Sequence, residues 1–446
     1  MNLSNSRVRF ITLGCKVNQY ETQGMREVLE RAGAKAVSSK KPASDEVDFV
    51  VINTCTVTAE ADKENKYWIR RAKRDHPQAR IIVTGCGVVR DRASIEALPE
   101  VDLVLAQHEK DNIADRLLEA CGNPSLQDAP VFSRSRQEYT PLSISESEGH
   151  TRAFVKIQDG CNHACSFCKV VLVRGRSRSR ELADILDEIK RLRDSGYSEI
   201  VFAGIQLGAY GLDFKDENIR LIEVLEAASQ IEGIERLRLS SIEPTDVSPE
   251  LIRALGEISK CCHHLHIPLQ SGDDEILKGM NRRYRRAFYI DLIARLKDQM
   301  PDFSLTLDVM AGFPGETEDY FQNTIALLEA VKPLKCHVFP YSRREGTMAA
   351  RLEDVPDEIL QERVLRLKAV GERLGRAELA PYIGKTLPIL VERSKKNAVL
   401  RQGLSTNYLK VYFQGSQDWL GKIVPVELMA IQGDAFLGKS VLPRRS

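Results

Sequence analysis

Gly160-Cys161-Asn162-His163-Ala164-Cys165-Ser166-Phe167-Cys168 sets three cysteines at a CxxxCxxC spacing, directly after the strand-like run Ala153–Ile157. Three thiolates this close in sequence can surround one metal centre, but a structural zinc ion needs four protein ligands. A four-iron cluster held by three cysteines leaves one iron open to a small molecule. The spacing therefore predicts a [4Fe-4S] cluster on Cys161, Cys165 and Cys168.

Two simpler interpretations compete with this cluster. His163 could complete a zinc knuckle, or the three cysteines could be buried free thiols. A histidine two residues after the first cysteine is poorly placed to close the same tetrahedron, and clustered free thiols are uncommon. The ligand chemistry therefore favours iron and sulfide over zinc.

The composition is that of a globular protein without a membrane span. The 446 residues, 43% hydrophobic and 28% charged, predict two to four domains. No window approaches the ~18 uncharged apolar residues of a span, and the polar start lacks the apolar core of a signal peptide. Ten cysteines without such a signal indicate metal or redox chemistry in a reducing compartment. We therefore expect a cytoplasmic protein with no membrane partner.

The first 125 residues alternate strand-like and helical runs, which predicts a doubly wound parallel α/β domain. The strand-like runs are Arg7–Leu13, Asp48–Asn53, Arg80–Gly85 and Asp102–Ala106, and the helical runs are Asn18–Arg31, Ala59–Asp75 and Asn112–Ala120.

Cys15, Cys55 and Cys86 each follow one of these strands by one or two residues. Ligands of an open α/β sheet bind beyond the carboxyl ends of its strands, so we expect the three thiols to converge and hold a second cluster. The alternative is that each is a small buried hydrophobe, as free cysteines commonly are. Asn18 and Glu21 could orient this site, although helix capping would also explain Asn18 and solvent exposure would explain Glu21.

After a linker at 126–148, six strand-like runs are each followed by a helical pattern, which predicts a partial (β/α)6 barrel. The strands are Ala153–Ile157, Glu199–Ile205, Arg236–Ile242, His264–Leu269, Ser304–Gly312 and Cys336–Tyr341, and the helices are Leu182–Arg193, Asn218–Ser229, Pro249–Ile258, Ala287–Met300, Glu318–Val331 and Glu358–Ala377. In such barrels the chemistry gathers at the C-terminal ends of the strands. Phe167, Gly204, Ser241 and Gly312 lie near these ends and are candidate cofactor contacts, although glycine-containing turns also occur for geometry alone.

The last segment predicts a small antiparallel β-barrel of the kind that binds oligonucleotides. Its strand-like runs are Thr386–Val391, Ala398–Arg401, Asn407–Phe413, Lys422–Ala430 and Ala435–Val441. From Gly384 onward ten Lys/Arg stand against four Asp/Glu, a net charge of +6, which leaves −5 for the rest of a chain whose total is +1. This asymmetry favours contact with a polyanion.

Basic residues interleaved with small or aromatic residues suit phosphate and base contacts. They follow the cysteine loop and recur in the last segment, and the candidate RNA contacts are Arg174, Arg176, Arg178, Lys395, Lys396, Tyr408 and Lys410. The alternative for each is an ordinary charged surface.

Together these motifs resemble the radical S-adenosylmethionine (SAM) methylthiotransferases over nearly the whole chain. Leu13-Gly14-Cys15-Lys16-Val17-Asn18-Gln19-Tyr20-Glu21, Phe154-Val155-Lys156-Ile157-Gln158-Asp159-Gly160-Cys161 and His337-Val338-Phe339-Pro340-Tyr341-Ser342 resemble the MtaB branch. The resemblance assigns 1–125 to a methylthiotransferase domain with an auxiliary cluster, 149–380 to a radical SAM core and 381–446 to a TRAM-type RNA-binding domain. Lys169–Val173 departs from a family run that usually contains Pro-Tyr.

The resemblance implies two [4Fe-4S] clusters and SAM as cofactors, tRNA as a partner, and an external electron donor and sulfur source. The MtaB branch methylthiolates C2 of N6-threonylcarbamoyladenosine, 3′-adjacent to the anticodon, giving 2-methylthio-N6-threonylcarbamoyladenosine. The Cys161/Cys165/Cys168 cluster would generate a radical from SAM, and the Cys15/Cys55/Cys86 cluster would carry sulfur. No catalytic side chain is assigned, because the cofactors carry the chemistry. The alternatives are another modified adenosine, a ribosomal protein side chain, or a zinc-stabilised RNA-binding protein without activity.

Overall fold

A computed structural model of the protein describes residues 3–37, 46–122, 139, 141–215, 218–393 and 400–441, with the backbone alone at 121 and 122. The chain divides into two compact units. The N-terminal unit comprises Met1–Glu146, Gln158–His163 and Cys168–Arg180, and the C-terminal unit comprises Ser147–Ile157, Ala164–Phe167 and Glu181–Ser446. No helix of the described residues is long and apolar enough to cross a membrane.

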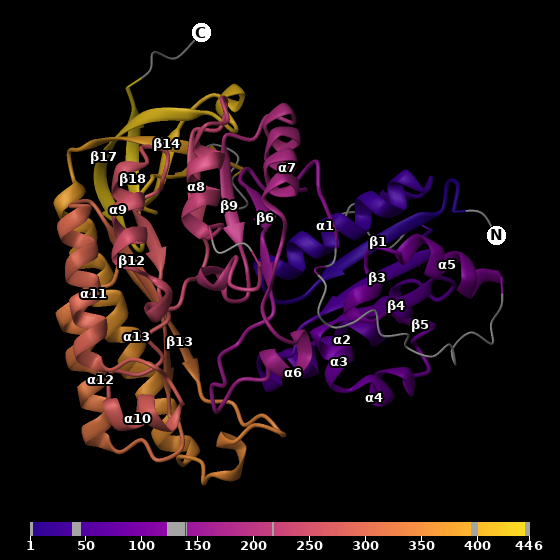
Figure 1. Ribbon diagram of the computed structural model, residues 1–446, viewed down its shortest axis with the longest axis horizontal. Coiled ribbons are helices and arrows are strands. Elements are labelled where there is room, and N and C mark those ends of the chain that lie inside the picture. The colour runs from indigo at the N-terminus through magenta and orange to yellow at the C-terminus, as the bar shows by residue number, and fades with distance from the viewer. Residues whose placement is uncertain are drawn as a thin grey trace. The chain divides into compact units, whose positions relative to one another are not determined.

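The N-terminal unit contains a parallel sheet with the strand order β2-β1-β3-β4-β5 (Figure 1). Its strands are β1 (Arg7–Thr12), β2 (Lys35–Val37), β3 (Phe49–Thr54), β4 (Arg80–Gly85) and β5 (Leu103–Val104). The order reverses between β1 and β3, as in doubly wound sheets, so the predicted architecture is confirmed. The sequence did not predict β2, because this edge strand has three residues, none of them buried, and is too short to show a period.

Helices cover both faces of this sheet. They are α1 (Lys16–Arg31), α2 (Ala59–Asp75), α3 (Cys86–Arg90), α4 (Arg92–Glu96), α5 (Ile113–Gly122) and α6 (Val170–Arg174), with the short strands β7 (Gln158–Asp159) and β8 (Arg178–Ser179) in the same unit. Ile52 of β3 packs in one core with Ile69 of α2, and its neighbour Val51 packs in a second core with Met25 of α1. Because successive residues of a strand face opposite sides, β3 is apolar throughout.

Part of the predicted linker packs against α1. Tyr20 donates a hydrogen bond to the carbonyl of Leu142 (2.7 Å), and the Ser145 amide donates to the Glu27 carboxylate (2.8 and 3.0 Å). Residues 126–138 and 140 lie outside the described residues. The segment 141–146 therefore belongs to the N-terminal unit.

Gly85, which ends β4, is required by the close approach of β3. Its φ is +101°, and an added Cβ would lie 2.4 Å from the carbonyl oxygen and 2.5 Å from the amide nitrogen of Thr54. Gly85→Ala is therefore expected to lower the free energy of unfolding by at least about 3 kcal/mol, measured by urea denaturation. Gly196→Ala is the control, because Gly196 has φ +89° but open space around it, and it should cost about 1–2 kcal/mol. Equal losses of unfolding free energy in the two variants would contradict the expected clash with the Thr54 backbone.

The C-terminal unit contains the predicted parallel strands. They are β6 (Ala153–Lys156), β9 (Glu199–Ala203), β10 (Arg236–Leu239), β11 (His264–His266), β12 (Ser304–Ala311) and β13 (Lys335–Pro340). They form the runs β6-β9-β10 and β11-β12-β13, joined by parallel bridges at Leu237–Cys261 and Ser241–His266. The predicted partial barrel is therefore confirmed.

The helices of this unit follow the predicted positions within a few residues. They are α7 (Leu182–Asp194), α8 (Leu221–Ser229), α9 (Pro249–Glu257), α10 (Asp274–Gly279), α11 (Arg286–Gln299), α12 (Glu318–Val331) and α13 (Asp357–Leu379). In Figure 1, α11, α12 and α13 pack side by side along β12 and β13. The sequence did not predict α10, because its six residues are too few to show a helical period.

The last segment forms a closed barrel with the order β14-β15-β16-β18-β17. Its strands are β14 (Thr386–Glu392), β15 (Leu400–Leu404), β16 (Lys410–Gln414), β17 (Ile423–Gln432) and β18 (Ala435–Ser440). Among these described strands every pair is antiparallel, as predicted, except β16–β18, which is parallel. The exception arises because β17 lies between them in sequence and runs opposite to β18. Residues 398 and 399 of one predicted strand lie outside the described residues.

This small barrel is attached to the N-terminal ends of the parallel strands. Arg236, which begins β10, donates to the carbonyls of Leu404 (2.9 Å) and Pro388 (2.7 Å), and Ser304, which begins β12, donates to the carbonyl of Asn407 (2.5 Å). The C-terminal ends of the strands, where chemistry was expected, are therefore opposite the small barrel.

Candidate metal and cofactor sites

The structure places Cys15, Cys55 and Cys86 beyond the ends of three neighbouring parallel strands. Cys15 is the N-cap of α1, Cys55 directly follows β3, and Cys86 begins α3 directly after β4. The positions after β1 and β3 flank the point where the strand order reverses, which is where such sheets bind ligands. Burial raises the pKa of Cys55 to about 11, and the thiols of Cys86 and Cys15 contribute to the rise. The three thiols are thus electrostatic neighbours.

The residue chemistry of this set suits a cluster better than a single ion. In the part of the chain that the structure describes, no three His, Cys, Asp or Glu side chains converge closely enough to hold one metal ion. Cysteines that hold a four-iron cluster bind different irons, so they need not meet at one point. The donor set, three cysteines with no carboxylate or imidazole, is also that of an iron–sulfur cluster.

Buried polar side chains surround these thiols. Asn18 donates to the carbonyls of Leu13 (2.7 Å) and Thr54 (3.0 Å), which tie the ends of β1 and β3 together. Asn53, also buried, donates to the carbonyl of Asn18 (3.0 Å). Helix capping does not explain Asn18, because Cys15 is the N-cap of α1, and solvent exposure does not explain Glu21, which is 2% exposed. Both residues instead support the thiol site.

Arg174, at the end of α6, lies inside the same unit and contacts Cys86. Its Nε donates to the Cys86 sulfur (3.2 Å), and its terminal nitrogens donate to Glu21 (2.9 Å), Asp159 (3.0 Å) and Asn18 (2.8 Å). Burial raises the pKa of Cys86, and the positive charges of Arg174 and Lys110 oppose this rise. The guanidinium of Arg174 is buried in ion pairs, so this structure offers no support for its predicted contact with RNA, which stays untested.

Arg178 is buried in a similar set of bonds, and its predicted contact with RNA likewise stays untested. It donates to Asp159 (3.0 Å) and to the carbonyl of Arg174 (2.8 Å), and it is buried. Arg176, between the two, is exposed, so its predicted contact with RNA stays open. Arg174 and Arg178 are thus turned inward, whereas Arg176 faces outward.

In the N-terminal unit, the CxxxCxxC loop contributes Cys161 and Cys168. The sulfur of Cys161 accepts a hydrogen bond from the amide of His163 (3.3 Å), and the sulfur of Cys168 accepts one from the amide of Val170 (3.4 Å). The Cys161 amide donates to the carbonyl of Gly175 (3.1 Å), which fixes the start of the loop. Backbone donors aimed at sulfur suit cysteines that carry negative charge as cluster ligands.

In the C-terminal unit, Cys165 has a charged donor of its own. The guanidinium of Arg282 donates to the Cys165 sulfur (3.3 Å) and forms an ion pair with Glu243. Glu243 follows β10, at the C-terminal end of the strand. Burial alone would lower the pKa of Arg282, but the surrounding anionic groups outweigh it and raise the pKa. The sequence did not predict either residue as part of the site, because the two are far apart in the chain.

The candidate SAM contacts lie near the C-terminal strand ends, as expected from the sequence. Gly204 follows β9, and Ser241 lies just past β10 and forms the bridge to His266. Phe167 packs against a buried cluster that includes Phe313 and Tyr341. Gly312 has a structural explanation, because φ is +72° and an added Cβ would lie 2.4 Å from Leu360 Cδ1. Contact of these four residues with SAM stays a prediction.

The structure gives Tyr408 partners inside the protein. Its ring stacks on His264 (centroids 4.1 Å apart, planes at 11°) and the guanidinium of Arg238 lies 5.3 Å from its centroid. Base stacking requires a free ring face, so these contacts offer no support for the predicted contact of Tyr408 with RNA, which stays untested. Lys410 is half-buried, with Nζ 4.8 Å from the Tyr412 ring, and stays a candidate. Lys395 and Lys396 lie outside the described residues.

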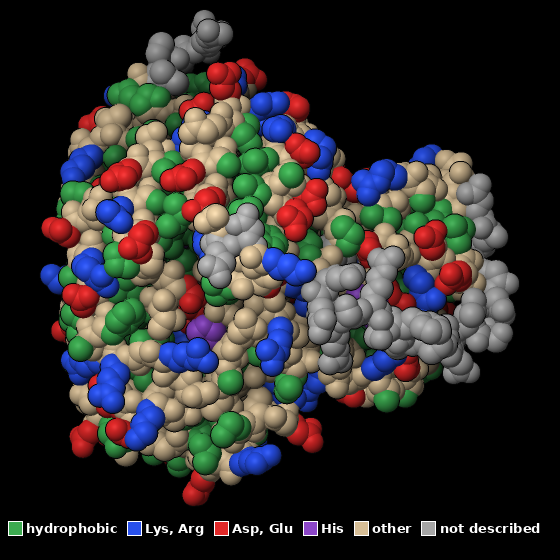
Figure 2. All heavy atoms as spheres, viewed as in Figure 1, with side chains coloured by type: hydrophobic (Ala, Val, Ile, Leu, Met, Phe, Trp, Pro, Cys, Tyr) green, Lys and Arg blue, Asp and Glu red, His purple; other side chains and the backbone are tan. Residues whose placement is uncertain are grey.

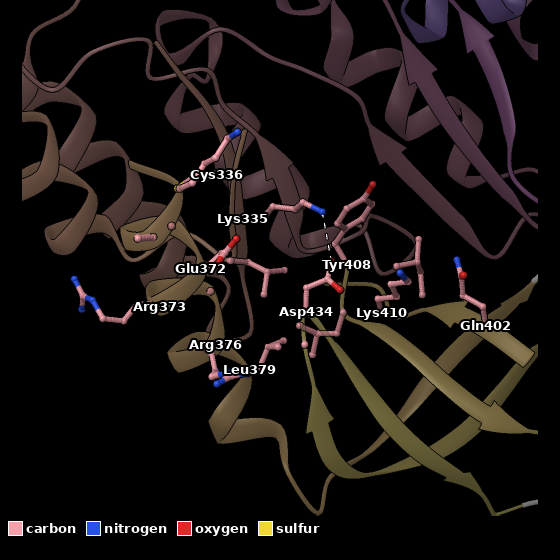
Figure 3. Close-up of a pocket in the computed structure, with 18 of the residues that line it drawn as sticks. Lys335, Cys336, Glu372, Arg373, Arg376, Leu379, Gln402, Tyr408, Lys410 and Asp434 are labelled. Atoms are coloured by element: carbon pink, nitrogen blue, oxygen red, sulfur yellow. Dashed lines mark ion pairs between the residues drawn. The ribbon is translucent and has the colours of Figure 1, made fainter. Parts of the chain in front are cut away.

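A cavity of about 950 Å³ lies between α13, the start of β13 and the small barrel (Figure 3). Its charged lining residues are mostly basic: Arg152, Lys335, Lys368, Arg373, Arg376 and Lys410, with Glu372, Glu392 and Asp434. Lys335 pairs with Asp434 (3.6 Å) and Arg152 pairs with Glu392 (2.8 Å), so Lys368, Arg376 and Lys410 contribute a surplus of positive charge. On the face shown in Figure 2, by contrast, Lys and Arg are intermixed with Asp and Glu.

Comparison with known proteins agrees with this arrangement. A model of the Radical SAM superfamily matches residues 155–328, and one described as Uncharacterized protein family UPF0004 matches residues 7–106. The fold resembles a radical S-adenosylmethionine methyltransferase, TsrM, from Kitasatospora setae, with a TM-score of 0.57, 13% sequence identity, and 78% of this chain and 77% of that chain covered.

Relatives of known name match over nearly the whole chain. "Threonylcarbamoyladenosine tRNA methylthiotransferase MtaB" of Bacillus subtilis is 39% identical, covering 95% of this chain and 93% of its own. The Thermotoga maritima protein of the same name is 37% identical, covering 92% of each chain. A "tRNA-2-methylthio-N(6)-dimethylallyladenosine synthase" of Acetivibrio thermocellus is 33% identical, covering 94% and 88%. The chain therefore belongs to the radical SAM methylthiotransferases, enzymes that transfer a methylthio group.

Proposed function

We propose that the protein methylthiolates C2 of N6-threonylcarbamoyladenosine in tRNA, at the position 3′-adjacent to the anticodon. The observation that carries this proposal is similarity along almost the entire chain to relatives named for threonylcarbamoyladenosine, at 35–39% identity. Relatives named for dimethylallyladenosine match at 32–33% identity, so the choice between the two modified adenosines needs a direct test.

We also propose two clusters, one on Cys161, Cys165 and Cys168 and one on Cys15, Cys55 and Cys86. A radical SAM enzyme of this family uses SAM with a [4Fe-4S] cluster. SAM and the two clusters would together supply radical and sulfur chemistry that no side chain provides. The protein's own part is to hold and orient these groups. Arg282 fixes the charge beside Cys165, and Asn18 fixes the strand ends beside Cys15 and Cys55.

The substrate assignment is tested with the purified, iron-loaded enzyme. Two tRNA preparations are used, one carrying N6-threonylcarbamoyladenosine and one carrying N6-dimethylallyladenosine, each with SAM, a reductant and a sulfide source. Nucleoside mass spectrometry should detect the 2-methylthio product only in the first. Product in the second preparation alone would overturn the choice of adenosine while leaving the family assignment intact.

We further propose that the basic cavity contacts tRNA phosphates. Because it lies at the N-terminal ends of the strands, it would contact a part of the tRNA distant from the modified base. Phosphate contacts by Lys and Arg make affinity depend on salt, with the slope of log affinity against log salt changing by about 0.7–0.9 per contact. Lys368 and Lys410 are the natural positions to test, since both line the cavity.

Reversing both charges, with Lys368→Glu and Lys410→Glu, should weaken tRNA binding about tenfold or more and make the salt slope shallower. The measurement is filter binding of tRNA at several salt concentrations. Arg253→Glu on α9 is the matched control, because Arg253 is exposed and lies outside the cavity lining, and it should leave the affinity nearly unchanged. An equal loss in both variants would show a general charge effect instead of a binding cavity.

A further inference from the structure

Arg174 has more contacts than a structural ion pair requires. Arg174 belongs to a set of five buried charged groups, together with Glu21, Asp159, Lys110 and Arg178. Glu21 also pairs with Lys110 (2.5 Å), and Asp159 also pairs with Arg178 (3.0 Å). Each carboxylate therefore has a second cation, and Arg174 is not needed to neutralise either one.

These five groups carry a surplus of one positive charge. One further negative charge next to Arg174 would balance these five groups, and burial favours such a balance. The group that its Nε contacts is the sulfur of Cys86 (3.2 Å), which also accepts a hydrogen bond from Gln107 (3.3 Å). A cysteine that binds iron is a thiolate, and it supplies the missing negative charge.

The orientation of Arg174 toward this sulfur is fixed by its other bonds. Both terminal nitrogens are held, one between Glu21 and Asp159 and the other by Asn18, so the planar guanidinium cannot turn its Nε away. Arg174 also stands six residues after Cys168 in the same loop. The segment that follows the CxxxCxxC loop is thus held by a hydrogen bond to Cys86, a proposed ligand of the other cluster.

We propose that Arg174 is a positioning residue for the auxiliary cluster, and that its hydrogen bond to the Cys86 thiolate raises the reduction potential of that cluster. Reduction adds negative charge, and a guanidinium beside a ligand sulfur stabilises the added charge. Hydrogen bonds to the sulfurs and nearby charge are established determinants of cluster potential. This inference rests on the proposed presence of a cluster on Cys15, Cys55 and Cys86.

The test uses the full-length chain with Cys161, Cys165 and Cys168 replaced by alanine, so that the auxiliary cluster alone contributes iron. The midpoint potential of this cluster is measured by redox titration followed by electron paramagnetic resonance. Arg174→Met should shift the potential to a lower value. Arg178→Met is the matched control, because Arg178 pairs with the same Asp159 and donates to the carbonyl of Arg174, and it should leave the potential at the parent value.

The outcomes separate this inference from the proposed function. If the parent variant binds about four iron and Arg174→Met has an unchanged potential, the inference is overturned while the second cluster stands. If the parent binds no iron, the second cluster itself is absent. If Arg174→Met fails to fold or load, Arg174→Lys is measured instead, since it keeps a cation but loses the directed Nε donor. A lowered potential supports the inference and an unchanged one overturns it.

Discussion

A variant with Cys15, Cys55 and Cys86 all replaced by alanine is expected to keep about half of the iron of the parent protein and to cleave SAM reductively, but to form no methylthio product. Each four-iron cluster contributes about four iron and four sulfide, so the loss should be about four of eight. The reason is that these thiols lie beyond the ends of β1, β3 and β4, separate in sequence from the loop expected to bind SAM. Iron and sulfide analysis, deoxyadenosine formation and nucleoside mass spectrometry measure the three quantities.

The matched control is the replacement of Cys261 and Cys262 by alanine. Both are buried and lie between α9 and β11, far in sequence from both triads. This variant should keep all its iron and its activity. Full iron content in the Cys15/Cys55/Cys86 variant would contradict the second cluster.

The complementary variant, with Cys161, Cys165 and Cys168 replaced by alanine, is expected to lose both reductive cleavage of SAM and methylthiolation. It too should retain about four iron per chain, held by the remaining triad. SAM needs the open iron of a cluster that three cysteines hold, and no other group in the protein is expected to replace that iron. Deoxyadenosine formation is measured against the wild type under the same reductant.

Comparing SAM cleavage and iron content in the two variants shows which triad holds the cluster that cleaves SAM. Cleavage of SAM that survives in the Cys161/Cys165/Cys168 variant would show that the roles of the triads are exchanged or shared. A loss of all iron in either variant would show that one cluster cannot assemble without the other. The contacts of Arg174 make structural dependence possible, so unfolding midpoints of both variants should be recorded alongside the iron content.

The sequence was sufficient to predict the architecture. Strand runs such as Arg80–Gly85 and helices such as Ala59–Asp75 and Glu318–Val331 were predicted with the bounds that the structure shows, because long periodic segments bury one consistent face. The placement of three cysteines after parallel strands was predicted by the geometry of doubly wound sheets alone. The ligand role of all six cysteines stays a prediction that iron analysis must test.

The sequence could not predict the contacts that join distant segments. Arg174 and Arg178 lie in a run of alternating arginines, which indicates a solvated or RNA-binding surface until Glu21 and Asp159 are known to lie beside it. The sequence made Tyr408 a candidate RNA contact. It could not reveal the pairing with His264, which is 144 residues away in sequence and depends on how the small barrel is attached. Buried charge of this kind can be recognised only once the fold has brought the segments together.

The most direct test of the central claim, methylthiolation of N6-threonylcarbamoyladenosine, is nucleoside mass spectrometry of tRNA from the source organism with and without the gene. Deletion should abolish 2-methylthio-N6-threonylcarbamoyladenosine and leave its unmethylthiolated precursor in place, and a plasmid copy should restore the product while a copy lacking Cys15, Cys55 and Cys86 should not. An unchanged level of 2-methylthio-N6-threonylcarbamoyladenosine after deletion would contradict the account.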